Sequence, residues 1–139
     1  MNPWKLKGYL TNQGENVVSE WCRSVEDDEW LAFAFNMDYL CGQPANRWGR
    51  PWAEKLHGEC KGLVEIIFEV RNIQHRPLGY YSGEMEFTLL FFATEVNNRF
   101  EPITACEIAN RRRSDIETGR RRASVFRIEE NIKDEDSKE

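Results

Sequence analysis

The chain has 139 residues, a net charge of −5, and hydrophobic and aromatic shares of 40% and 12%. Its length fits one ordinary domain, and its apolar share is enough for a packed core, so the chain is expected to fold alone. No stretch approaches the roughly 18 consecutive apolar residues that cross a bilayer, and Met1 to Lys7 lack the apolar core of a signal peptide. A soluble, cytoplasmic protein without membrane contact is therefore expected.

The charge is distributed unevenly along the chain. Most nucleic-acid binders are basic, so the acidic total argues against a whole-molecule field that attracts RNA. Residues 129–139 hold six acids and two lysines, a local charge of −4, whereas residues 111–127 hold seven arginines and two acids, a local charge of +5. The sequence therefore predicts a local basic patch, with Arg120 to Arg122 open to RNA, to an acidic partner or only to solvent.

The first 44 residues predict a strand and a helical hairpin. Polar and apolar residues alternate over 5–10, as in a short strand. Apolar residues then recur at helical spacing over 17–25 and, most clearly, over 30–41. Acidic residues 26–29 suit the positive end of the second helix, and Gly42 and Pro44 end it.

Residues 44–62 predict a loop that contains Trp48 and Trp52. We expect both rings to pin this loop onto the helical hairpin, and the alternative is a stacking platform for bases. From Leu63 the apolar period becomes two, which predicts a strand over 63–71.

A second strand is predicted over 73–81, where Pro77 indicates an edge or a bulge. Ser82 and Gly83 predict a hairpin turn, and the apolar run 87–93 predicts the central strand. A last helix is predicted over 105–116. The expected fold is α+β, a small antiparallel or mixed sheet with an N-terminal helical hairpin and a C-terminal helix, in the order β-α-α-β-β-β-α. The expected domain covers residues 1–119, followed by a charged, partly disordered tail over 120–139.

The chain has four cysteines, and none has the close spacing of a zinc or dithiol redox site. Three of them lie in apolar patterns that predict helices, so buried free thiols are expected, with no metal and no cofactor. The four are Cys22, Cys41, Cys60 and Cys106.

A series of motifs between Arg50 and Arg113 resembles the phage-derived HigB-like toxins of the RelE/HigB superfamily. The motifs are Arg50-Pro51, Lys55-Leu56-His57-Gly58, Gly62-Leu63-Val64-Glu65-Ile66, His75-Arg76-Pro77-Leu78-Gly79-Tyr80-Tyr81, and the helix 105–113 with its Ala109-x-x-Arg112 ending. The similarity covers roughly residues 5 to 117. It implies a RelE-like fold and a toxin of a type II toxin–antitoxin pair, with a helix-turn-helix antitoxin as its partner.

The resemblance also implies ribosome-dependent cleavage of messenger RNA without a metal. In that reaction a 2′-hydroxyl loses a proton and attacks the adjacent phosphorus, so the protein must supply cationic clamps and proton-transfer groups. By position in the motifs, the implied site residues are Arg76, Lys55, His57, Tyr80 and Arg71. For Arg76, the alternative is an ion pair with Glu65 or Glu69 across the hairpin. His75 is expected to face solvent.

Two departures from the family pattern argue against cleavage. The arginine that follows Glu-Ile in the family is Ile67 here, and the family's lysine pair after the central strand is replaced by a segment that contains Glu95. Glu95 would repel a phosphate. The alternative function is a catalytically inactive module that binds RNA, the ribosome or a protein partner. A gyrase-directed toxin of the related ParE type is a third hypothesis that no motif favours, and the oligomeric state is open.

Overall fold

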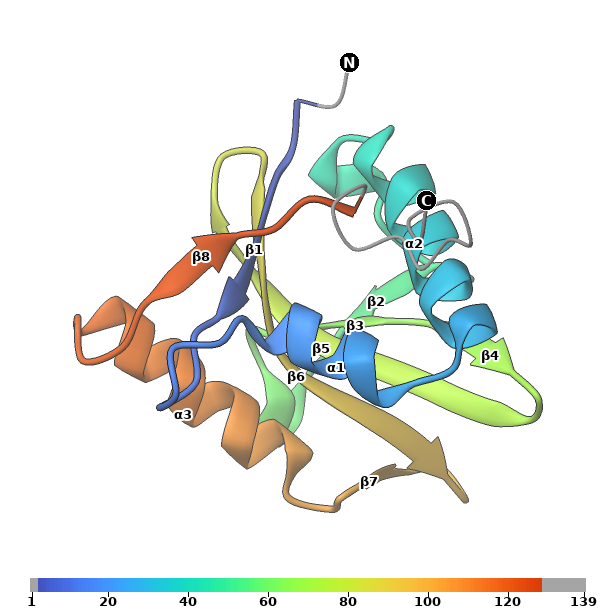
Figure 1. Cartoon of the computed structure of the whole chain (residues 1–139). Coiled ribbons are helices and arrows are strands. Elements are labelled where there is room, and N and C mark those ends of the chain that lie inside the picture. The colour runs from blue at the N-terminus through green and yellow to red at the C-terminus, as the bar shows by residue number, and fades with distance from the viewer. Residues whose placement is uncertain (1–2, 129–139) are drawn as a thin grey trace, which may run out of the picture.

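The computed structural model describes residues 3–128 and shows an open, mostly antiparallel sheet with helices on both faces (Figure 1). The helices are α1 (Val17–Ser24), α2 (Asp27–Cys41) and α3 (Ala105–Glu117), with 3-10 turns η1 (Ala45–Arg47) and η2 (Gly58–Cys60). The strands are β1 (Lys5–Tyr9), β2 (Ala53–Lys55), β3 (Val64–Ile66), β4 (Phe68–Val70), β5 (Ile73–Gly83), β6 (Glu86–Val96), β7 (Arg99–Glu101) and β8 (Ala123–Val125). The predicted α+β class is confirmed.

The sheet is built around the long β5–β6 hairpin. Its order is β2-β3-β5-β6-β1-β8, while β4 also pairs with β5 and β7 with β6. Strand β1 runs parallel to β6, and the other pairs are antiparallel. Strands β2, β7 and β8 therefore add to the order of elements that the sequence predicts.

The single strand predicted over 63–71 is interrupted at Ile67, whose backbone N–H donates to the Trp52 carbonyl (2.9 Å) instead of continuing the ladder. Strands β3 and β4, on either side of it, both pair with β5, and Pro77 lies opposite the gap between them. Because proline has no N–H, that gap is a place where β5 tolerates it. Pro77 itself pairs in register with Phe92 of β6 on an interior strand, and the register of β5 against β6 shifts one residue later, between Leu78 and Gly79.

The predicted helical hairpin is present and covers one face of the sheet. The apolar stripe of α2 is fully buried there through Trp30, Phe33, Met37 and Leu40. The start of α2 is fixed by a capping box, in which Glu26 and the residue three positions later bond each other's backbone N–H groups.

Trp52 packs on the helical hairpin as predicted, whereas the ring of Trp48 packs on Trp4, which precedes β1. Trp52 stacks on Tyr39 of α2, with ring centroids 4.1 Å apart. Trp48 is buried, 4.6 Å from the ring centroid of Trp4. Both rings thus attach the loop to the helical side of the sheet.

Helix α3 packs on the opposite face, where Ala105 and Ala109 are buried against Leu78 and Leu90. A disulfide joins Cys60 of η2 to Cys106 of α3, so the expectation of free thiols was wrong for this pair. The two residues are 46 positions apart, and only the packing of η2 beneath α3 brings them together. Cys22 and Cys41 are buried thiols, as expected.

The sheet continues beyond residue 119, because β8 pairs with β1 and Phe126 is buried in the core. The Asn16 amide, which also caps α1 through its oxygen, donates to the Ser124 carbonyl (3.0 Å) and holds this segment in place. Residues 129–139, where the acidic tail was predicted, lie outside the described residues. No helix in the described part of the chain is long and apolar enough to cross a membrane.

Candidate functional site

Arg76 lies on β5, on the sheet face opposite α1 and α2, and is 7% exposed. Its Nε atom donates to Oε1 of Glu95 on β6 (3.2 Å) and lies 3.9 Å from Oε1 of Glu65 on β3. The ion pair with Glu65 that the sequence offered as an alternative is therefore present, and the second carboxylate comes from Glu95 and not from Glu69.

The guanidinium of Arg76 is held in a fixed orientation. Nη1 donates to the His75 carbonyl (2.8 Å) and Nη2 to Oε1 of Gln74 (3.2 Å). With the bond to Glu95, the protein uses three of the five N–H groups that a guanidinium carries. Arg76 is thus an oriented cation, with a carboxylate already at its Nε edge.

The carboxyl group of Glu65 is buried on this face of the sheet. Glu65 is 5% exposed, between Val64 and Ile66 of the same strand, whose side chains point into the core on the other face. Burial raises the pKa of Glu65 from 4.5 to about 7, against the opposing effect of the Arg76 charge. A carboxyl group that titrates near neutrality can both accept and return a proton under cellular conditions.

A second guanidinium approaches Glu65 from the edge of the sheet. Nη2 of Arg50 lies 2.6 Å from Oε1 of Glu54 and 4.0 Å from Oε2 of Glu65. Glu54 stands opposite Glu65 in the β2–β3 register, and the Arg50 side chain is largely exposed. The site that we call the sheet-face cluster consists of Arg50, Glu54, Glu65, Arg76 and Glu95.

Two other predicted site residues have different partners. Arg71 lies in the β4–β5 turn and bonds Asp28 (2.8 and 3.0 Å) and Glu29 (3.0 Å) at the start of α2, on the other face of the sheet. Tyr80 shares the face of Arg76 but is buried under α3, where the Arg113 guanidinium lies 5.8 Å from its ring centroid. Burial raises the pKa of the Tyr80 hydroxyl.

The side chains of Lys55 and His57 are exposed and make no hydrogen bond or ion pair with the other residues that the structure describes. The pleat of β2 places Lys55 on the same side as the buried Ala53, away from Arg76. His57 precedes η2. Of the residues that the resemblance implies, only Arg76 belongs to the sheet-face cluster.

His75 does not face solvent, and that expectation was wrong. Strand alternation directs it toward the helices, where it is 4% exposed and its Nε2 lies 2.8 Å from Oε2 of Glu29. Its ring stacks on Phe68, with centroids 4.9 Å apart. Burial lowers the pKa of His75, although the Glu29 carboxylate acts in the opposite direction.

Sequence reasoning missed Glu65, Glu54 and Arg50 as members of a site. One signal was present, because Glu65 is a charged residue inside the apolar run Leu63 to Phe68. A charge in such a run requires a partner when the strand is buried. The identity of that partner depends on strand pairing, which local sequence does not specify.

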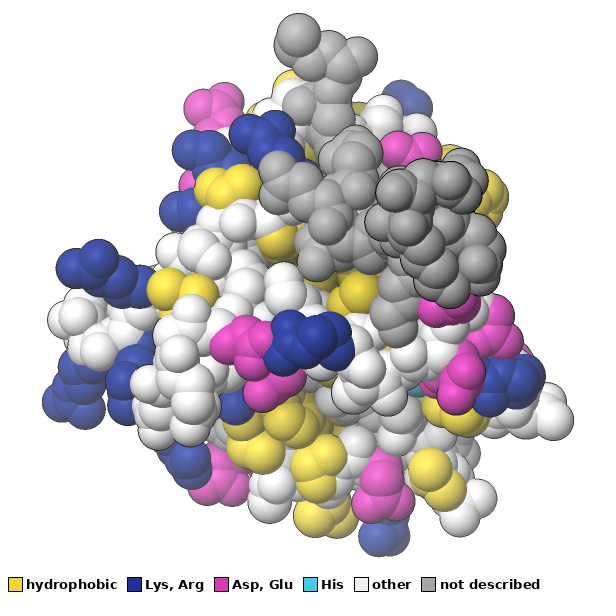
Figure 2. Space-filling view, in the orientation of Figure 1, with side chains coloured by type: hydrophobic (Ala, Val, Ile, Leu, Met, Phe, Trp, Pro, Cys, Tyr) yellow, Lys and Arg dark blue, Asp and Glu magenta, His cyan; other side chains and the backbone are white. Residues whose placement is uncertain are grey.

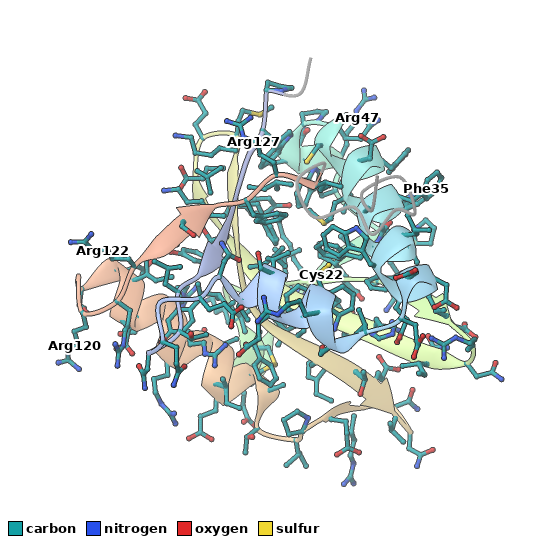
Figure 3. The ribbon with its side chains drawn as sticks, in the orientation of Figure 1. Cys22, Phe35, Arg47, Arg120, Arg122 and Arg127 are labelled. Carbon is teal, nitrogen blue, oxygen red and sulfur yellow. A yellow bond between two sulfur atoms is a disulfide. The ribbon has the colours of Figure 1, made fainter. Side chains whose placement is uncertain are left out.

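A separate group of cations follows α3. Arg120, Arg121 and Arg122 are exposed, and their side chains make no contact of hydrogen-bond or ion-pair type with the described residues. We call these three residues the arginine corner. Figure 2 shows basic side chains gathered on the α3–β8 side of the molecule, and Figure 3 shows Arg120 and Arg122 directed outward.

Comparisons of the chain with protein-family models, with curated proteins and with solved structures give no match. Within residues 3–128, no group of three or more His, Cys, Asp and Glu side chains is arranged to hold a metal ion.

Proposed function

We propose that the protein is a RelE/HigB-like toxin that cleaves RNA, and that the sheet-face cluster is its cleavage site. One observation carries this proposal: the buried carboxyl of Glu65, with a pKa near neutrality, lies between the guanidinium groups of Arg76 and Arg50 at 3.9 and 4.0 Å. An acid–base group between two phosphate-binding cations is what phosphodiester cleavage by a neighbouring hydroxyl requires.

In the proposed reaction, the ionised Glu65 carboxylate removes the proton of a ribose 2′-hydroxyl. The 2′-oxygen forms a bond to phosphorus, the bond to the 5′-oxygen breaks, and water protonates that leaving oxygen. The products are a 2′,3′-cyclic phosphate and a 5′-hydroxyl end. Arg76 and Arg50 stabilise the charge on the phosphoryl oxygens, for which the planar guanidinium geometry is well suited.

Glu95 occupies the Nε edge of Arg76, so a phosphate oxygen must replace it there. Its side chain is 30% exposed and can move toward solvent. With Glu54, the cluster holds three carboxylates and two guanidiniums, which disfavours the capture of free RNA. This charge balance supports a substrate delivered by the ribosome, with the arginine corner supplying a separate contact to RNA phosphates.

The position of the Glu95 carboxylate on Arg76 favours a second candidate function, an RNA-binding module without cleavage. If Glu95 stays on Arg76, no phosphate reaches the cluster, and the arginine corner becomes the RNA contact. In either function the toxin resemblance implies a helix-turn-helix antitoxin as a partner, which we include in the proposal.

The test is cleavage of a reporter messenger RNA in a reconstituted translation mixture. Wild type is compared with Arg76→Ala, with Glu65→Gln, and with Glu69→Gln as a matched control, because Glu69 is an exposed glutamate of β4. We expect cuts with wild type and the control, and none with the two cluster variants. Cuts that persist in both cluster variants would exclude this site. Absence of cuts from all four folded proteins, with RNA binding that depends on the arginine corner, would establish the binding module.

A further inference from the structure

Helix α2 presents an apolar ridge to solvent on the side that faces away from the sheet. Leu31, Phe35 and Tyr39 follow each other at i, i+4 and i+8 and are 52%, 68% and 41% exposed. Figure 3 shows Phe35 projecting outward from α2. Three large apolar side chains form one exposed row on this helix, and exposed apolar patches mark interaction sites.

The ridge borders a groove of about 260 Å³ that is lined mainly by apolar side chains of α2 and of the loop before β2, among them Pro51 and Trp52. Trp52 stacks on Tyr39 and lies 6.2 Å from Phe35, measured between ring centroids. These contacts fix the Trp52 ring as one wall, so the groove exists before any partner arrives. A preformed aromatic groove binds with little loss of side-chain freedom.

A buried acceptor lies at the base of the groove. Asn36 lines it and is 2% exposed, and its amide Nδ2 donates to the carbonyls of Ile67 (2.9 Å) and Trp52 (3.3 Å). Those two bonds fix the orientation of the amide, and Oδ1 accepts no hydrogen bond from the described residues. A buried acceptor without a donor costs free energy of folding.

The charge around the ridge indicates the charge of the partner. The segment between Arg23 and Arg47 contains five acidic residues and no lysine or arginine, and Asp27, Asp28 and Asp38 of α2 are exposed. Arg71 pairs with Asp28 and Glu29 and offsets only one of these negative charges. The apolar ridge is therefore flanked by negative charge, which favours a cationic partner and repels RNA.

We propose that the α2 ridge and its groove form a docking surface for a basic amphipathic helix of a partner protein. A row at i, i+4 and i+8 is the ridge that packs into the groove of a second helix. The partner would place apolar side chains beside Phe35 and Trp52, and lysines or arginines beside the acids of α2. The ridge lies on the face of the sheet opposite to Arg76 and Glu65, and the proposal does not rest on the proposed cleavage.

The probe is a fluorescein-labelled model peptide of leucine and lysine in amphipathic helical order, with a leucine–glutamate peptide of the same order as its counterpart. Anisotropy titrations compare the full-length wild type with a Phe35→Ala/Tyr39→Ala variant and with Ile103→Ala, an exposed apolar residue outside the surface. We expect the double variant to bind the lysine peptide at least about tenfold more weakly and the Ile103 variant to bind it like wild type.

The glutamate peptide is expected to bind at least about tenfold more weakly than the lysine peptide. Equal binding of the lysine peptide by wild type and the double variant would overturn the proposal, as would its failure to bind wild type. The same double variant tests two other occupants of the ridge, a second copy of the chain and RNA. Loss of a dimer in the double variant, seen by light scattering, would assign the ridge to a second copy of the chain. Loss of RNA binding in that variant would assign it to base stacking.

Discussion

Replacement of Glu65 by glutamine is predicted to stabilise the folded protein above about pH 7 and to change stability little near pH 4. Glutamine keeps the shape of the neutral carboxyl but cannot ionise. In the wild type, the folded state holds a proton on Glu65 that the unfolded chain has already lost, because burial raises the pKa of this group. The free energy of unfolding of the wild type therefore falls as pH rises, whereas that of the variant has no such contribution.

The magnitude follows from the two pKa values. The carboxyl titrates at 4.5 in the unfolded chain and at about 7 in the folded protein, a difference of about 2.5 pH units. Each unit corresponds to about 1.36 kcal/mol, so the wild type loses about 3 kcal/mol between those pH values. Above about pH 7 both states are ionised and the loss is complete. Glu65→Gln should therefore exceed wild type by about 3 kcal/mol at pH 8.

Urea unfolding of both proteins, followed by tryptophan fluorescence from about pH 4.5 to about pH 8.5, measures this difference. The exposed Glu69→Gln variant controls for the loss of a surface charge and should differ from wild type by less than about 0.5 kcal/mol throughout. A difference between Glu65→Gln and wild type that stays constant over this range would refute the assignment of a near-neutral pKa. A variant that is less stable at high pH would show that the Arg76 ion pair outweighs burial.

Further perturbations test the core, the disulfide, the basic surface and the acidic segment at residues 129–139. Phe33→Ala should lower the free energy of unfolding by about 3–5 kcal/mol in urea titrations, whereas Phe35→Ala, on the exposed side of the same helix, should cost less than about 1 kcal/mol. Reduction of the Cys60–Cys106 disulfide, which closes a loop of 46 residues, should cost up to about 4 kcal/mol and lower the melting temperature, and a Cys60→Ser/Cys106→Ser variant should be insensitive to the reductant. Replacement of Arg120 to Arg122 by glutamine should reduce the slope of log affinity for RNA against log salt concentration by about two. Deletion of residues 129–139 should strengthen RNA binding at low salt. An unchanged affinity would exclude a masking role for that acidic segment.

The elements that local periodicity controls could be predicted from the sequence. The stripe from Trp30 to Leu40 predicts both α2 and the residues that it buries, because apolar side chains at helical spacing form a face that packs against the rest of the protein. Pro77 likewise predicts an irregularity in β5, because a residue without an N–H cannot continue a ladder. Strand β8 was not predicted, since its three residues follow an arginine run and gain their partner only from β1.

The composition of the candidate site could not be read from the sequence for a related reason. Glu65, Arg76 and Glu95 come from three strands, and their contacts depend on a register that a shift of one residue would destroy. The motifs include Arg76 but group it with Arg71 and Tyr80, which packing directs to other partners. His75 was misplaced because its exposure depends on α2, a helix more than 30 residues earlier in the chain.

The central claim, that Glu65 transfers the proton in RNA cleavage, is tested most directly by the pH dependence of the single-turnover cleavage rate on ribosome-bound messenger RNA. The wild-type rate should rise with an apparent pKa of about 7 and level off above it, because the base form of Glu65 is then complete, and Glu65→Gln should show no cleavage at any pH. A Glu65→Gln variant that cleaves with the wild-type pH profile would contradict the claim.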